Sequence, residues 1–115
     1  IGLAVGCASI ESNAYKTFGT ISVAVDTAML SWGEWVRTNE AAGTPVSVEA
    51  EAQVRKVYHE YQMKMFTAEL VVDTYVKLKG AGGGEPGQIT DAVEAARVAS
   101  IEIVKLICKL RGGCN

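Results

Sequence analysis

The feature that most constrains the fold is an apolar seam in segment 48–79. Apolar residues recur there at steps of three and four, a spacing that places them on one face of an α-helix. The seam consists of Val54, Val57, Tyr61, Met65, Ala68, Val72 and Tyr75. Ser47 is a good N-cap for this helix, and Glu49 and Glu51 place negative charge in its first turn, where the helix dipole favours it. A helix of about 32 residues is about 48 Å long and needs partners of similar length.

Two further segments supply such partners. Segment 9–39 carries a stripe of the same spacing, made of Tyr15, Phe18, Ser22, Val25, Met29, Trp32 and Val36. Segment 90–110, which Thr90 is expected to cap, carries a third stripe, made of Val93, Ala96, Ser100, Ile103, Ile107 and Leu110. We therefore predict an all-α fold, an up-down-up bundle of three long helices over about 9–39, 48–79 and 90–110.

The length of 115 residues fits one domain with a real core, since 49% of the residues are hydrophobic. We divide the chain into an apolar N-terminal segment (1–8), a single three-helix domain (9–111) and a C-terminal tail (112–115). The first segment is interpreted either as the remnant of a signal sequence or as a segment used in assembly. The glycine-rich stretch 80–87 is expected to be a connector between the second and third helices.

Charge and residue content argue against several classes of function. Eleven basic and thirteen acidic residues give a net charge of −2, so the basic surface of a nucleic-acid-binding protein is not expected. His59 is the only histidine, and the three cysteines lack the spacing of a metal site, so we expect no metal ligands. No nucleophile has a matched base in a known motif. The sequence therefore predicts a protein that is not an enzyme, with no catalytic residue, no cofactor and no small-molecule substrate.

The N-terminal segment ends in Ala4-Val5-Gly6-Cys7, after which the first charge is Glu11. These four residues resemble the lipobox of bacterial lipoproteins, in which the cysteine thiol carries a diacylglycerol; Ala4 stands where that family prefers leucine. The resemblance implies lipidation of Cys7, export and a location at the periplasmic face of a bacterial membrane. Small bacterial lipoproteins, prophage-encoded ones included, have this size and build. Alternatively, Cys7 is a buried or disulfide-bonded cysteine near an apolar terminus.

The other two cysteines, Cys108 and Cys114, lie on either side of Gly112 and Gly113. Glycine readily adopts the positive φ that would fold the tail back on the helix end, so a Cys108–Cys114 disulfide is sterically plausible and would indicate an oxidising compartment. Two alternatives remain open. Cys7 could pair with either of them and tie the termini together, or all three cysteines could be reduced.

Trp35 and Tyr58 are the candidates for contact with a protein partner. Trp32 continues the inner stripe of its helix, whereas Trp35 lies on a neighbouring face. Trp35 either packs under the first turn or anchors a partner or a membrane surface. Apolar residues outside the seam of the second helix exceed what one three-helix core needs, and oligomerisation through the second or third helix would bury them. They include Val71, Val76 and Leu78.

These observations lead to two functional expectations. The first is a helical-bundle protein with a structural or protein-binding role, exported and anchored to a membrane by a lipid on Cys7. The alternative is a self-assembling structural subunit of a virion or an extracellular filament, in which the apolar N-terminus packs against a neighbouring copy. Both expectations involve a protein partner or self-association.

Overall fold

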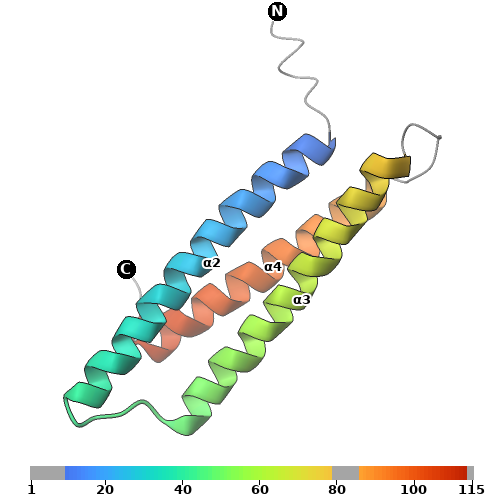
Figure 1. Ribbon diagram of the computed structural model, residues 1–115. Coiled ribbons are helices and arrows are strands. Elements are labelled where there is room, and N and C mark those ends of the chain that lie inside the picture. Colours follow the sequence, from blue (N-terminus) through green and yellow to red (C-terminus); the bar gives the residue numbers. More distant parts are fainter. Residues whose placement is uncertain (1–9, 79–85, 114–115) are drawn as a thin grey trace, which may run out of the picture.

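The computed structural model describes residues 10–78 and 86–113, which form three long α-helices (Figure 1). The helices are α2 (Ile10–Ala41), α3 (Val48–Leu78) and α4 (Pro86–Leu110). Successive helices run in opposite directions, and the two described ranges contain no strand. The all-α fold and the up-down-up arrangement predicted from the sequence are therefore confirmed.

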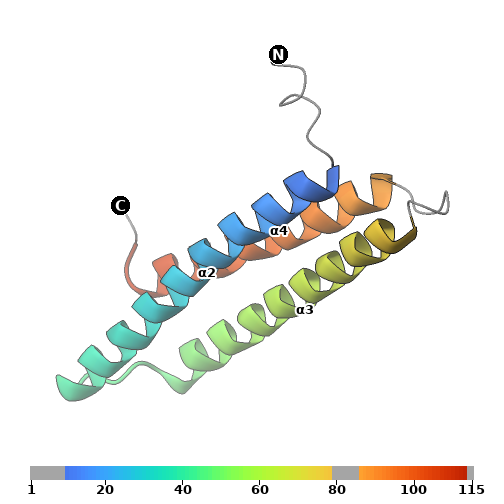
Figure 2. The same cartoon turned by 45° about the horizontal axis from the view of Figure 1, so that its top comes forward.

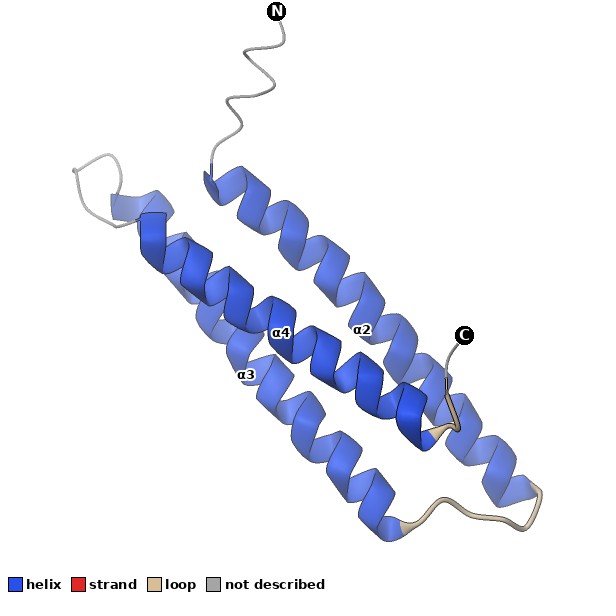
Figure 3. Cartoon of the chain, turned by 180° about the vertical axis from the view of Figure 1, so that it is seen from behind, coloured by secondary structure: helices blue, strands red, loops and turns tan. Residues whose placement is uncertain are grey.

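The helix that joins the other two is α4. It contacts both α2 and α3 extensively, whereas α2 and α3 contact each other over a much smaller surface. Seen from behind, α4 lies in front of the space between α2 and α3 (Figure 3), and Figure 2 shows the same arrangement from another direction. Near the end of α4, Arg111 donates a hydrogen bond from Nη1 to Oγ of Ser31 on α2. The outer faces of α2 and α3 are left uncovered as a result.

One continuous core runs between the helices. Its buried members are Ala14, Phe18, Ile21, Val25, Trp32, Val54, Tyr61, Met65, Ala68, Val72, Ile89, Ala96, Ala99, Ile103 and Ile107. On α3 every residue of the predicted seam is buried or half-buried, and on α4 the same holds for the predicted stripe. The periodicity of the sequence therefore identified the inner faces of these two helices correctly.

The inner face of α2 differs from the predicted one. Tyr15 is 44% exposed, while Ala14 and Ile21, which the predicted stripe omitted, are 3% and 5% exposed. Because α2 packs mainly against α4 and little against α3, its buried face is narrow and is rotated away from Tyr15. Phe18 and Val25 belong to both the predicted and the observed face.

The turn between α2 and α3 is built by local hydrogen bonds. At the end of α2, Gly43 has a φ of 80°, and the N–H groups of Gly43 and Thr44 donate to the carbonyls of Glu40 and Asn39 at 3.2 and 2.9 Å. These two bonds and the left-handed glycine form a Schellman motif, which satisfies the last carbonyls of the helix. Ser47 then caps α3 as predicted, because its Oγ accepts a 3.1 Å hydrogen bond from the N–H of Ala50.

The predicted start of the third helix was wrong by about one turn. The helix α4 begins at Pro86 rather than at residue 90, so Thr90 lies inside it. Proline is well tolerated in the first turn of a helix, where its missing N–H has no acceptor in any case and its fixed φ is already helical. The additional turn brings Ile89, which is 1% exposed, into the core. The other helix ends lie within two residues of their predicted positions.

Candidate functional site

Of the three cysteines only Cys108 belongs to the described residues, and it lies half-buried in the last turn of α4. The glycines after it have positive φ angles, 93° at Gly112 and 109° at Gly113, as the sequence predicted. The N–H of Gly113 donates to the carbonyl of Cys108 at 2.7 Å, and that of Gly112 to Lys109 at 3.2 Å, which makes a second Schellman motif. Cys7 and Cys114 lie outside the described residues, so lipidation of Cys7 and the Cys108–Cys114 disulfide remain predictions.

The two candidate partner-binding aromatics, Trp35 and Tyr58, are half-buried and pack against the core. The rings of Trp32 and Trp35 lie 5.3 Å apart between centroids at an interplanar angle of 37°, and Tyr58 stacks on Tyr61 at 6.0 Å and 24°. Trp32 is 7% exposed, in agreement with its predicted place in the core. Each candidate therefore has a structural contact of its own, and its binding role remains a prediction.

A small pocket between α2 and α3 brings Trp32 and Tyr58 together, whereas Trp35 does not line it. Its volume is about 160 Å³, and its lining consists of Met29, Trp32, Glu51, Val54, Arg55 and Tyr58. Pockets that hold small organic ligands usually measure about 300–1,000 Å³. This pocket is too small to suggest a substrate site.

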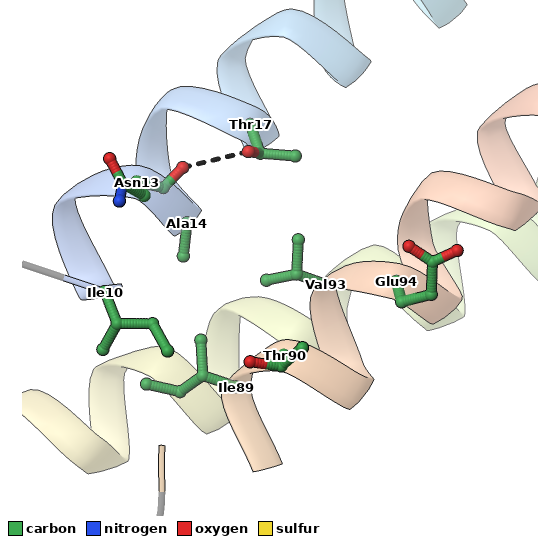
Figure 4. A pocket seen from close by; sticks show the side chains of 8 residues that line it. All are labelled: Ile10, Asn13, Ala14, Thr17, Ile89, Thr90, Val93 and Glu94. Atoms are coloured by element: carbon green, nitrogen blue, oxygen red, sulfur yellow. Dashed lines mark hydrogen bonds between the residues drawn. The ribbon is translucent and has the colours of Figure 1, made fainter. Parts of the chain in front are cut away.

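A second pocket lies between the first turns of α2 and α4 and has a volume of about 200 Å³ (Figure 4). Ile10, Ala14, Ile89 and Val93 point toward one another across it, and Asn13, Thr17, Thr90 and Glu94 complete its lining. Arg97 binds both carboxylate oxygens of the lining residue Glu94 at 2.9 and 2.5 Å and thereby lowers the pKa of that carboxyl group. This exposed ion pair compensates the charge of Glu94. The wall of the pocket is mainly apolar.

His59 is exposed on the outer face of α3. In residues 10–78 and 86–113, no group of three or more histidine, cysteine, aspartate or glutamate side chains is placed to hold a metal ion. None of the three described helices is long and apolar enough to cross a membrane.

The most prominent surface feature is a row of exposed apolar side chains on α3. Met63, Phe66 and Leu70 are 51%, 62% and 55% exposed, and we call these three residues the α3 stripe. They follow one another at steps of three and four, so they share one face of the helix, and this face lies opposite the buried seam. Large apolar side chains that gather in a row on a surface are typical of interaction sites.

The other exposed apolar residues do not form such a row. On α2, Val23 and Leu30 are exposed, two turns apart, and on α4, Val98 and Ile101 are only 41% and 37% exposed. The sequence analysis expected a surplus of apolar residues on the second helix at Val71, Val76 and Leu78. Val76 and Leu78 are indeed 39% and 44% exposed, whereas Val71 is half-buried. The signal for the α3 stripe was present as a second set of three- and four-residue steps, which the stronger seam obscured.

Comparison of the chain with protein-family models, with curated proteins and with solved structures gives no match.

Proposed function

We propose that this protein has a structural or protein-binding role, not an enzymatic one, and that it acts through the α3 stripe. The observation that carries the proposal is the exposure of Met63, Phe66 and Leu70 on one face of a regular helix. An amphipathic helix with a second apolar row presents the anchors by which helices bind one another. A partner that covers the row removes apolar surface from water, and this burial is the main favourable term in protein association.

We further propose that the protein is exported and anchored to a bacterial membrane by a lipid on Cys7. The lipobox-like residues Ala4-Val5-Gly6-Cys7 support this anchor. The left-handed turn at Gly112 and Gly113 supports the Cys108–Cys114 disulfide, because it directs the chain back toward the end of α4. An exposed α3 on an anchored bundle would be available to partners at the membrane surface.

A second candidate is a self-assembling subunit of a virion or an extracellular filament. The α3 stripe also supports this role, since assembly would cover the exposed row with a neighbouring copy. In this case the apolar segment 1–8 is retained and packs against that copy.

The mass of the intact, natively produced protein separates the two candidates. A chain that starts at Cys7 and carries acyl mass supports the lipoprotein, and a gain of two protons on reduction supports one disulfide. An unmodified chain that retains residues 1–6 contradicts the anchor and favours the assembling subunit. Replacing Cys7 by Ser should release an anchored protein from the membrane fraction without unfolding it.

Chemical cross-linking in the producing cells tests the binding role itself. We expect Phe66→Glu to abolish the cross-linked adducts of the wild-type protein. Val23→Glu is the matched control, because Val23 is a similarly exposed apolar residue on α2, at 67%. If the adducts of Phe66→Glu equal those of the wild type, the α3 stripe has no binding role and the proposal is wrong.

A further inference from the structure

We propose that the occupant of the α3 stripe is α3 of a second copy of this chain, packed antiparallel about a two-fold axis. This inference rests on the proposed binding role and adds the identity and orientation of the partner. The order of residues along the exposed face and the charges beside that face support this pairing.

The exposed residues on this face of α3 have the same spacing in both directions along the helix. His59, Met63, Phe66 and Leu70 follow one another at steps of four, three and four, and all four are exposed. When two such helices lie antiparallel with the axis midway between Met63 and Phe66, Met63 of each copy faces Phe66 of the other. His59 then faces Leu70 in both outer positions. An isologous interface needs this kind of self-complementary surface.

The charges on one flank of the stripe favour the same arrangement. Arg55 and Asp73 are 18 residues apart, which is five turns at 3.6 residues per turn, so they lie on the same flank of α3. In a two-fold antiparallel pair each flank faces the identical flank of the partner. With the axis midway between Met63 and Phe66, Arg55 of one copy lies opposite a position one residue away from Asp73 of the other copy. Both side chains are exposed, so two Arg–Asp pairs can form in each dimer.

A parallel pair would lose this complementarity, because its two-fold axis runs along the helices and each flank then faces the opposite flank of the partner, where neither Arg55 nor Asp73 lies. The two Arg–Asp pairs can therefore form only in the antiparallel orientation, so the charges on the flank favour that orientation. Asp73 also accepts a hydrogen bond from Tyr15 through Oδ1. A carboxylate accepts several hydrogen bonds, and its second oxygen remains able to accept one from Arg55 of the partner.

The size of the stripe predicts a reversible dimer. Stable interfaces bury about 1,200–2,000 Å² in total. Three apolar side chains over two turns of each helix provide only part of that area. We therefore expect dimers that form as the concentration rises and dissociate on dilution.

Sedimentation velocity of the full chain over a concentration series tests the dimer. We expect the wild type and Val23→Glu to shift from monomer to dimer, and Phe66→Glu to remain monomeric with an unchanged helical circular dichroism spectrum. Non-reducing electrophoresis of the same samples identifies any covalent dimers. A wild type that is monomeric throughout, or a Phe66→Glu dimer as stable as the wild type, overturns the proposal.

Charge reversal tests the antiparallel orientation. In Arg55→Asp the facing groups are both acidic, and in Asp73→Arg both are basic, so each variant alone should dimerise at least tenfold more weakly than the wild type. Mixed together, the two variants place an acid opposite a base at both sites, and we expect a heterodimer of nearly wild-type affinity. If mixing restores nothing, the antiparallel pairing is wrong.

The outcomes also separate this inference from the proposed function. A monomeric wild type whose cross-links to a different protein still depend on Phe66 would overturn the second copy as occupant and leave the binding role intact. Binding of the monomer to phosphatidylglycerol vesicles that Phe66→Glu abolishes would overturn both, and would identify the stripe as a membrane contact.

Discussion

The hydroxyl of Tyr15 donates a 2.6 Å hydrogen bond to Oδ1 of Asp73, and this bond joins α2 to α3. The two helices contact each other little elsewhere, because α4 supplies most of the packing for both. The bond also raises the pKa of Tyr15, since the neutral hydroxyl donates to the carboxylate and the ionised form would repel it. The side chain that the sequence predicted for the core therefore acts at the edge of the bundle as a polar link.

The Tyr15–Asp73 bond predicts a loss of stability at alkaline pH. A tyrosine whose pKa is raised in the folded state contributes stability that is complete below its unfolded value of about 10 and is lost as the pH rises through the folded pKa. We expect the urea midpoint of the wild type to fall between pH 9 and pH 11, and to fall less in Tyr15→Phe. At pH 8, Tyr15→Phe should cost about 0.5–1.5 kcal/mol, at the low end because Tyr15 is exposed.

Tyr61 makes this comparison necessary. Its burial raises its pKa as well, so Tyr61 adds to the alkaline loss in both proteins. Only the difference between wild type and Tyr15→Phe reports on the bond. Identical pH dependence in the two proteins would show that the bond contributes nothing to folding.

Close packing of α4 predicts a high cost for enlarging its small residues. Ala96 is 0% exposed at the centre of the inner face. Replacing it by Leu should destabilise the protein by roughly 1–3 kcal/mol, because the added atoms must push neighbouring side chains off their preferred rotamers. Ala24→Leu on the exposed face of α2 is the control and should change little. Urea denaturation followed by circular dichroism measures both, and equal stability of the two variants would contradict close packing at Ala96.

Replacing Gly43 and Gly19 by alanine should change the stability of the protein in opposite directions. Gly43 has a φ of 80°, which costs an L-residue roughly 1–2 kcal/mol, so Gly43→Ala should destabilise the protein. Gly19 lies within α2, and a Cβ added there would meet nothing within 4 Å. Gly19→Ala should stabilise by roughly 0.5–1 kcal/mol through helix propensity alone. Thermal melts of both variants test this prediction. A Gly43→Ala variant that is more stable than the wild type would contradict the left-handed turn at Gly43.

Because Trp35 is half-buried and Phe66 is exposed, replacing each by alanine should lower the free energy of unfolding by different amounts. Trp35 contacts Trp32 and the core, so Trp35→Ala should lower the free energy of unfolding by about 1–3 kcal/mol. Phe66 is 62% exposed, and Phe66→Ala should stay within about 0.5 kcal/mol of wild type when measured at concentrations where the chain is monomeric. A Trp35→Ala variant as stable as wild type would favour Trp35 as a partner anchor over its packing role.

Local features of the sequence were sufficient to predict the three helices of this protein. The spacing of Val54, Tyr61 and Val72 identified the inner face of α3, and Ser47 identified its first turn, because periodicity and capping depend on residues within a few positions of each other. The glycines after α4 predicted its left-handed end for the same reason. The start of α4 was missed because Pro86 was read as part of a connector, although proline also suits a first helical turn.

The tertiary structure alone decided which faces are covered. Tyr15 and Ile21 lie on neighbouring faces of α2, and only the position of α4 determines that Ile21 is buried and Tyr15 is not. On α3, the spacing of Met63, Phe66 and Leu70 is compatible both with a helix buried on two faces and with a helix whose outer face is exposed. Only the tertiary structure shows that this face is exposed. Helical periodicity specifies which residues share a face, but burial depends on how many neighbours pack around the helix, and this number follows from contacts between distant segments of the chain.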